Sequence, residues 1–330
     1  MKKTIVVTGA AGFIGRNVVA ELNRRGEDHL LLVDELGTDD KWRNLVGLRY
    51  DDLVSPDAFL LDVQNDRMKD VRAIVHMGAC SATTEKDADY LLENNYRYTR
   101  TLAEWAAEKG VRMVYASSGA TYGDGSQGYS DEDAVTPQLV PLNMYGYSKQ
   151  MVDLWALRCG MFNGAHPIVG LKFFNVYGPH EEHKGEMRSV VQKSFETISR
   201  EGKVNLFKSY RAEYADGEQR RDFLYVRDAV NVCLHFLEHS RVGGLFNCGT
   251  GQARTWKSLA EAVFAAMGRE PEIEFIEMPE ELRGKYQYFT EAKMEKLRAF
   301  GYQEKFATLE EGVTDYVQNY LQHSTLKGTV

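Results

Sequence analysis

The sequence lacks any apolar run that approaches the ~20 residues needed for a membrane-spanning helix. Its first apolar stretch ends at Val7, which is too short for the core of a signal peptide, so we expect a cytoplasmic protein with no membrane partner. Basic residues are in the minority: 48 Asp and Glu against 40 Lys and Arg give a net charge of −8, which disfavours a nucleic-acid partner. Internal repeats and low-complexity tracts are absent as well.

Cysteine is scarce, with four residues and no CxxC pair. A chain of 330 residues needs no covalent staple, so this pattern predicts buried, reduced thiols without disulfides. His183 has the chemistry of a metal ligand, but no partner cluster accompanies it, and we predict no metal site.

The residues that are present indicate a folded α/β protein. Hydrophobic residues make up 43% and charged residues 27%, which is typical of a globular chain of about two domains at this length. Apolar runs alternate with helical patterns through the first half, and this alternation predicts βαβ units in a doubly wound parallel Rossmann sheet. The expected strands are residues 4–8, 30–33, 73–75, 113–115 and 167–173, and the expected helices are 13–24, 87–109 and 145–159.

The second half is less regular and predicts a smaller, mixed α/β C-terminal substrate domain. Helical patterns cover residues 189–200, 228–239, 258–267 and 309–321, short strands cover 244–247 and 273–276, and 211–220 reads as an exposed loop. We therefore place a dinucleotide-binding domain at 1–175 and a substrate domain at 176–330. Segments near 223–250 are expected to return to the first domain.

A glycine-rich turn joins the first strand to the first helix. Gly9, Gly12 and Gly15 have the GxxGxxG spacing that permits a tight turn, close approach to a pyrophosphate and close helix packing. The helix N-terminus adds free N–H groups for the phosphates. Asp34, 19 residues after Gly15, ends the second strand, where an acid commonly accepts a hydrogen bond from the adenosine ribose. These features together predict a bound nicotinamide dinucleotide.

The choice between NADP and NAD stays open at this point. Asp34 and Glu35 would repel a 2′-phosphate and favour NAD, whereas Lys41 would pair with that phosphate. The alternative for Lys41 is a solvated surface lysine.

A second motif carries acid–base chemistry. Tyr145 and Lys149 form a Tyr-x-x-x-Lys pair on one helix face, and Tyr147 has no lysine four residues on. A neighbouring ammonium and a positive nicotinamide would lower the pKa of the Tyr145 phenol, which is ordinarily about 10, so that it accepts a hydroxyl proton while hydride leaves. Ser118, after the fourth strand, is placed to hold the reacting oxygen.

These motifs resemble the extended short-chain dehydrogenase/reductase superfamily from about residue 4 to 320. Further segments are similar to its family of ADP-L-glycero-D-manno-heptose 6-epimerases: residues 78–85, 94–96, 174–179, 183–185, 246–251 and 284–287. That resemblance implies an isomerase that inverts C6 of ADP-D-glycero-D-manno-heptose with tightly held NADP, for lipopolysaccharide core assembly. It also implies a homo-oligomer, often a pentamer.

The resemblance assigns roles to single residues. It implies Tyr145 and Lys184 as the two acid/base groups, Ser118 as the group that holds the oxygen, and Lys149 as the residue that tunes Tyr145 and touches the nicotinamide ribose. The implied cofactor contacts are Gly9, Gly12, Phe13, Ile14, Gly15, Asp34, Glu35, Lys41, Met77, Gly78, Ala79, Cys80, Ser81, Asn94, Lys149 and Val176. The implied substrate contacts are Ser118, Asn175, Phe207, Arg221 and Tyr286.

Some of these residues have a plain structural alternative. Lys184 could be a solvated loop lysine, Arg221 could pair with Asp222 or Asp228, and Tyr286 could pack under a loop. The sequence also departs from the family pattern. Glu35 and Pro56 stand where residues that contact the 2′-phosphate are usual, Glu186 and Lys193 replace substrate-side Ser and His, and the 209–219 segment is longer than usual.

Two other functions compete with this hypothesis. A hexose 4-epimerase of the same fold would share most motifs, with Lys184 as the discriminating residue. A module that senses NADP without catalysis would not need Tyr145, Lys149 and Ser118 together. A 4,6-dehydratase is disfavoured, because Gly119 and Ala120 occupy the place of its Asp-Glu pair.

Overall fold

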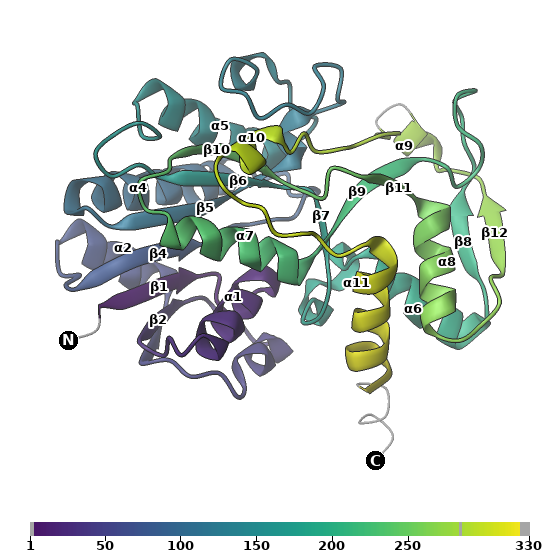
Figure 1. Cartoon of the computed structure of the whole chain (residues 1–330), viewed down its shortest axis with the longest axis horizontal. Coiled ribbons are helices and arrows are strands. Elements are labelled where there is room, and N and C mark those ends of the chain that lie inside the picture. The colour runs from purple at the N-terminus through teal and green to yellow at the C-terminus, as the bar shows by residue number, and fades with distance from the viewer. Residues whose placement is uncertain (1–2, 284–285, 324–330) are drawn as a thin grey trace.

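The computed structural model describes residues 3–283 and 286–323. A parallel sheet of seven strands forms its centre, in the order β10-β6-β5-β4-β1-β2-β3 (Figure 1). Its strands are β1 (Thr4–Thr8), β2 (Leu30–Val33), β3 (Asp52–Val54), β4 (Val71–His76), β5 (Arg112–Ser118), β6 (Val169–Phe173) and β10 (Gly244–Cys248). Strand order runs outward in both directions from β1, so the predicted doubly wound Rossmann sheet is confirmed.

Both faces of this sheet are covered by helices, which explains the continuous apolar strands. Ile5 and Val7 of β1 pack with α1 (Phe13–Arg24) and α7 (Val226–Glu238) on one face. Val6 points the other way and packs with α2 (Pro56–Gln64), α4 (Tyr98–Lys109) and α5 (Met144–Arg158). Side chains alternate across a strand, so a strand between two helix layers must be apolar at every position.

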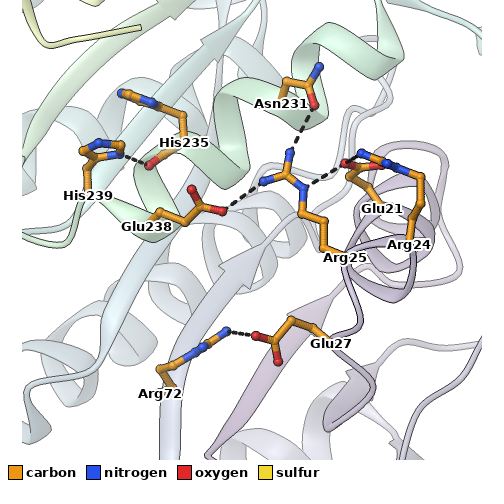
Figure 2. A network of polar contacts seen from close by, with 9 residues as sticks. All are labelled: Glu21, Arg24, Arg25, Glu27, Arg72, Asn231, His235, Glu238 and His239. Atoms are coloured by element: carbon orange, nitrogen blue, oxygen red, sulfur yellow. Dashed lines mark hydrogen bonds and ion pairs between the residues drawn. The ribbon is translucent and has the colours of Figure 1, made fainter.

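Polar contacts link α1 to α7 at the surface. Figure 2 shows Arg25, just after α1, between Glu21 of α1 and Glu238 of α7. Its guanidinium nitrogens lie 2.8 Å from the Glu21 carboxylate and 2.9 Å from the Glu238 carboxylate. Such partly solvated pairs contribute about 0–1 kcal/mol each, so the apolar contacts between the two helices dominate their packing.

The remaining elements gather beside one end of the large sheet (Figure 1). A three-stranded sheet holds β11 (Ala253–Thr255), β9 (Arg220–Tyr225) and β7 (Asn175–Tyr177), and a two-stranded sheet pairs β8 (Val204–Phe207) with β12 (Ile273–Ile276). Their helices are α6 (Val190–Glu201), α8 (Trp256–Ala266), α9 (Glu280–Arg283) and α11 (Leu309–Tyr316). The chain returns to the large sheet twice in this half, with α7 and β10, and α10 (Glu295–Ala299) packs against β10.

The expected elements occur with shifted boundaries, and a few features differ. The helix expected at 87–109 begins as α3 (Ala88–Leu91) and passes through a π-helical turn, Leu92–Arg97, before α4. Strand β3 and helix α2 were not predicted. The three residues of β3, beside Asp51, give no periodic signal. Among the described residues, no helix is long and apolar enough to cross a membrane.

The prediction that all cysteines are buried is wrong in part. All four are free thiols, but Cys159 is exposed and Cys80 only half-buried. Cys159 directly follows the last turn of α5, where the helix meets solvent, and Cys80 lies on the loop after β4.

Candidate functional site

A cavity of about 690 Å³ lies where β1, β4 and β5 end, and residues of α6 and α8 close its other side. This is the topological switch point of the sheet, where ligands of doubly wound folds bind. Eighteen of the predicted site residues line it: Gly9, Gly12, Phe13, Ile14, Gly15, Asp34, Lys41, Met77, Gly78, Ala79, Cys80, Ser81, Ser118, Tyr145, Lys149, Asn175, Val176 and Lys184.

The glycine turn has the shape that a pyrophosphate requires. Gly9 has a positive φ of 65°, and a Cβ there would lie 2.7 Å from the Gly78 nitrogen. Gly12 donates to the Gly9 carbonyl at 3.0 Å and begins α1 with no side-chain cap. The first N–H groups of α1 therefore face the cavity without a capping partner, and the residues fit a dinucleotide.

Replacing Gly15 with alanine is expected to damage this turn. Its Cβ would lie 2.1 Å from the Gly9 carbonyl oxygen, a backbone atom that moves only if the turn opens. Overpacking of this kind costs about 1–3 kcal/mol, and dinucleotide retention should fall with it. Cofactor content after gel filtration and the urea unfolding midpoint measure both effects. Gly164→Ala is the control, because the nearest atom to its Cβ is 3.8 Å away. Unchanged cofactor content in Gly15→Ala would contradict the turn's proposed role.

Asp34 is held in place by three donors. Its Oδ2 accepts from the Ala11 backbone at 2.7 Å, and its Oδ1 accepts from the Glu35 backbone at 2.8 Å and from Lys41 Nζ at 2.6 Å. Lys41 also donates to the Glu35 carbonyl at 2.9 Å, so it is a paired lysine at the cavity edge and not a solvated one. The Glu35 side chain is exposed and is not part of the cavity lining.

Tyr145 and Lys149 lie on consecutive turns of α5 and meet Ser118 at the end of β5. Asn143 caps this helix by accepting from the Gly146 backbone at 2.8 Å, which sets Tyr145 in the first turn. Ser118 forms a hydrogen bond with the Tyr145 phenol. Lys149 Nζ donates to the Ala116 carbonyl at 2.8 Å, and burial lowers its pKa to about 8. The predicted hydroxyl, phenol and ammonium therefore share one cavity wall.

In the protein without a bound cofactor, the pKa of the Tyr145 phenol lies above its ordinary value, whereas the sequence predicted a lowered pKa. Burial, the largest cause, raises its pKa, while the hydrogen bond with Ser118 lowers it to a smaller extent. Phenolate needs compensating positive charge in such a site, which a bound nicotinamide carries in its oxidised form.

Lys184 lines the same cavity from a different part of the chain. It lies on a 3₁₀ helix, Glu182–Met187, between β7 and α6. Its Nζ is 5.1 Å from the centre of the Phe13 ring and 4.0 Å from Glu181 Oε2. Burial lowers the pKa of Lys184, and the Glu181 carboxylate opposes that effect. An amine in these surroundings suits proton exchange better than a solvated lysine does.

The remaining predicted substrate residues form their own cluster next to the cavity. The Arg221 guanidinium lies 5.3 Å from the Tyr286 ring centre and 5.6 Å from that of Trp256, and Tyr286 meets Phe207 edge-on. Trp256 belongs to the cavity lining and so connects the two. Arg221 is 7% exposed and donates to the Arg220 carbonyl. Within the described residues it makes no ion pair with Asp222 or Asp228, whose carboxylates accept from Thr250 and Ala307 backbones.

Comparison with known proteins decides the family. The model of the NAD dependent epimerase/dehydratase family matches residues 5–249. The chain belongs to this family. It is therefore an enzyme with a nicotinamide cofactor, as the sequence predicts.

Close relatives within the family carry one name. The chain is 57% identical to the ADP-L-glycero-D-manno-heptose-6-epimerase of Nitratidesulfovibrio vulgaris (strain DP4), over 96% of this chain and 97% of the relative. A protein of the same name from Fusobacterium nucleatum is 46% identical over 96% of this chain and 98% of the relative. The crystal structure of the Helicobacter pylori ADP-L-glycero-D-manno-heptose-6-epimerase superposes with a TM-score of 0.81 at 25% identity, covering 96% of each chain. The predicted resemblance is confirmed.

Two polar residues near the cavity, Asn95 and Asn44, received no role from the sequence. Asn95 is fully buried within the π-helical turn. Its amide oxygen accepts from the Cys80 backbone and its amide nitrogen donates to the Cys80 carbonyl, at 2.9 Å each, and the nitrogen also donates to the Ser148 hydroxyl at 3.0 Å. Asn44 joins the Ala11 carbonyl at 2.9 Å to His183 at 3.1 Å. The predicted contact Asn94 is half-buried, donates to Asn95 and is not part of the cavity lining. Asn95 stood only within the segment 94–96 that carries the family resemblance, as a polar side chain in a helical pattern. In the described part of the chain, no group of acids, histidines and cysteines could hold a metal ion.

Proposed function

We propose that this enzyme inverts C6 of ADP-D-glycero-D-manno-heptose to give ADP-L-glycero-D-manno-heptose, a precursor for the lipopolysaccharide core. The observation that carries the proposal is that one cavity holds two separate proton-exchanging groups, Tyr145 on α5 and Lys184 on the loop before α6. Inversion of a carbinol through a ketone returns the hydride to the opposite face of the carbon, and a second acid/base group can then protonate the oxygen in its new orientation. The shared name of relatives at 46–57% identity supports this substrate.

Tyr145, Lys184 and Ser118 have separate roles in the proposed reaction. A bound nicotinamide supplies the acceptor and later the donor of the C6 hydride. One of the two groups, Tyr145 or Lys184, takes the C6 hydroxyl proton as that hydride leaves, and a 6-ketone results. Ser118 holds the oxygen by a hydrogen bond. After the ketone presents its other face, the hydride returns and the second group protonates the oxygen, so the reaction is redox-neutral.

The cofactor of this proposal is NADP. Lys41 supports it, since its ammonium lines the cavity and pairs with Asp34, the residue expected to meet the adenosine ribose. A 2′-phosphate would compete for that ammonium as a charge-assisted partner. Nucleotide released from the heat-denatured protein identifies the cofactor directly. Release of NAD alone would contradict this part of the proposal and leave the reaction intact.

On the substrate side, the proposal uses Asn175, Phe207, Arg221 and Tyr286. It places a cofactor domain at 1–175, to which 223–250 contributes, and a substrate domain at 176–330.

Arg221 is a buried cation between two aromatic rings, and its fork would bind diphosphate oxygens bidentately. Arg221→Lys keeps the charge and removes the fork. We expect it to raise KM about 10-fold or more, because hydrogen bonds to charged groups contribute about 1.5–3 kcal/mol. An unchanged KM would place the diphosphate elsewhere.

Proton NMR at C6 tests the reaction itself. Purified protein is mixed with ADP-D-glycero-D-manno-heptose without added cofactor, and growth of the L-glycero signal to equilibrium is the expected result. No conversion, with NADP⁺ and with NAD⁺ added in turn, would overturn the heptose assignment. UDP-hexoses measured in parallel test the alternative, a 4-epimerase of the same fold.

A further inference from the structure

The loop that carries Lys184 is closed at both ends by one buried carboxylate. Glu181 is fully buried. Its Oε2 accepts from the Ser189 backbone at 2.7 Å, and its Oε1 accepts from the Ser189 hydroxyl at 2.5 Å. The Gly178 backbone donates to the same carboxylate. Because Gly178 opens the loop and Ser189 caps α6, Glu181 draws the two ends together.

The loop is also attached to the cofactor turn. Asn17 of α1 donates to the Pro179 carbonyl at 3.0 Å, and Asn44 joins His183 to the Ala11 carbonyl. Gly185 bends the backbone directly after Lys184 with φ 53° and ψ −124°. These ties hold the Lys184 backbone over α1, so the position of its amine depends on the side chains around it.

A structural closure alone would not need a charge. A neutral amide would accept one of the Ser189 hydrogen bonds, whereas a fully buried carboxylate carries a desolvation cost unless a positive partner offsets it. Burial is the main cause that raises the pKa of Glu181, and Lys184 is the cation that opposes this. The 4.0 Å separation from Lys184 Nζ to Glu181 Oε2 places the two charges in direct electrostatic contact.

We propose that Glu181 is a positioning residue that fixes the Lys184 amine at the cavity wall and stabilises its ammonium form. This inference rests on the proposed acid/base role of Lys184. Where Lys184 is the second group, its ammonium donates a proton to the C6 oxygen as the hydride returns, and the resulting amine must regain a proton before the next turnover. Glu181 favours that regain, while the buried surroundings keep the amine form accessible.

Other titratable and aromatic groups surround the Glu181–Lys184 pair. His183 faces Lys184 from the same loop, and α1 presents the Phe13 ring. On the side of Glu181, Tyr316 of α11 contacts the carboxylate, and Glu182 and Glu196 lie near that phenol. Among the described charged groups, Glu181 is the one whose field acts on the charge of Lys184 in the stabilising direction.

The test separates the charge of Glu181 from its structural role. Amine acetylation of Lys184, followed by mass spectrometry across a pH series, reports its protonation without any substrate. In Glu181→Gln we expect the labelling midpoint to move to lower pH, since loss of the anion favours neutral amine. We expect kcat to fall about 10-fold or more, with KM changed much less, as for loss of acid–base efficiency. Glu182→Gln, an exposed carboxylate in the same loop, is the matched control and should match the unmodified enzyme.

Each outcome of this experiment decides the proposal. An unmoved midpoint in Glu181→Gln overturns it, even if stability or KM changes, because a purely structural residue would produce that pattern. If Glu181→Gln does not fold, Glu181→Asp is measured instead; its shorter carboxylate should give a partial shift, and a midpoint equal to that of the unmodified enzyme overturns the proposal. A midpoint that moves in an enzyme inactive on the heptose would retain the Glu181–Lys184 coupling and reject only the proposed reaction.

Discussion

Replacing Tyr145 with phenylalanine is expected to lower kcat by about 10²–10⁴-fold, the usual range for loss of a general acid or base. The change deletes one oxygen on α5 and leaves the ring, the helix and Lys149 in place. Cofactor binding should persist, because the glycine turn, Asp34 and Lys41 belong to other elements that line the cavity and keep their side chains. The measurement is initial rate by NMR, with bound nucleotide determined on the same preparation.

Tyr147→Phe is the matched control for this change. Tyr147 lies two residues further along the same helix, is 47% exposed and is not part of the lining of the main cavity. Its substitution should leave kcat unchanged. A Tyr145→Phe enzyme that retains more than about a tenth of its turnover would remove Tyr145 from the acid/base role, since such a loss is below that range.

Replacing Lys172 with methionine is expected to destabilise the fold by about 3–5 kcal/mol, the usual cost of breaking a buried ion pair from one side. Lys172 on β6 and Asp153 on α5 are both 0% exposed, and Lys172 Nζ lies 3.1 Å from Asp153 Oδ2. Tyr115 and Ser117 of β5 donate to the same carboxylate at 2.8 and 2.7 Å. Without Lys172 the Asp153 carboxylate stays buried with neutral donors and no positive partner. Because this lowers the free energy of unfolding, the urea unfolding midpoint should fall.

This pair also supports the candidate site. Asp153 lies four residues beyond Lys149 on α5, and Lys172 donates at 2.8 Å to Thr121, which in turn donates to the Ser118 carbonyl at 2.8 Å. We therefore expect a lower kcat in Lys172→Met as well. A double variant with Asp153→Leu should regain much of the lost stability, because no charge is then left unpaired. Lys203→Met, which breaks an exposed pair with Glu274, is the control and should leave the midpoint unchanged. A Lys172→Met midpoint equal to that of the control would refute the argument.

Local patterns in the sequence were sufficient for much of this protein. The run 4–8 followed by the glycine turn predicted β1, the start of α1 and the dinucleotide end of the cavity, since backbone shape there depends on adjacent residues. The spacing of Tyr145 and Lys149 predicted their common helix face for the same reason. The family resemblance added Lys184, which no periodic pattern would have selected.

Contacts between distant segments were decided only by the tertiary structure. Arg112 and Phe236, Asp153 and Lys172, and Asn44 and His183 are partners because separate elements of the chain meet in space. The pKa of Tyr145 belongs to this class too: the spacing to Lys149 suggested a lowered value, whereas burial in the folded chain raises it. Periodicity and turn chemistry act over a few residues, so the sequence alone determined the Rossmann elements and the types of functional group. Burial and electrostatic fields depend on the whole fold, and they determined which of those groups carry charge and what holds them in position.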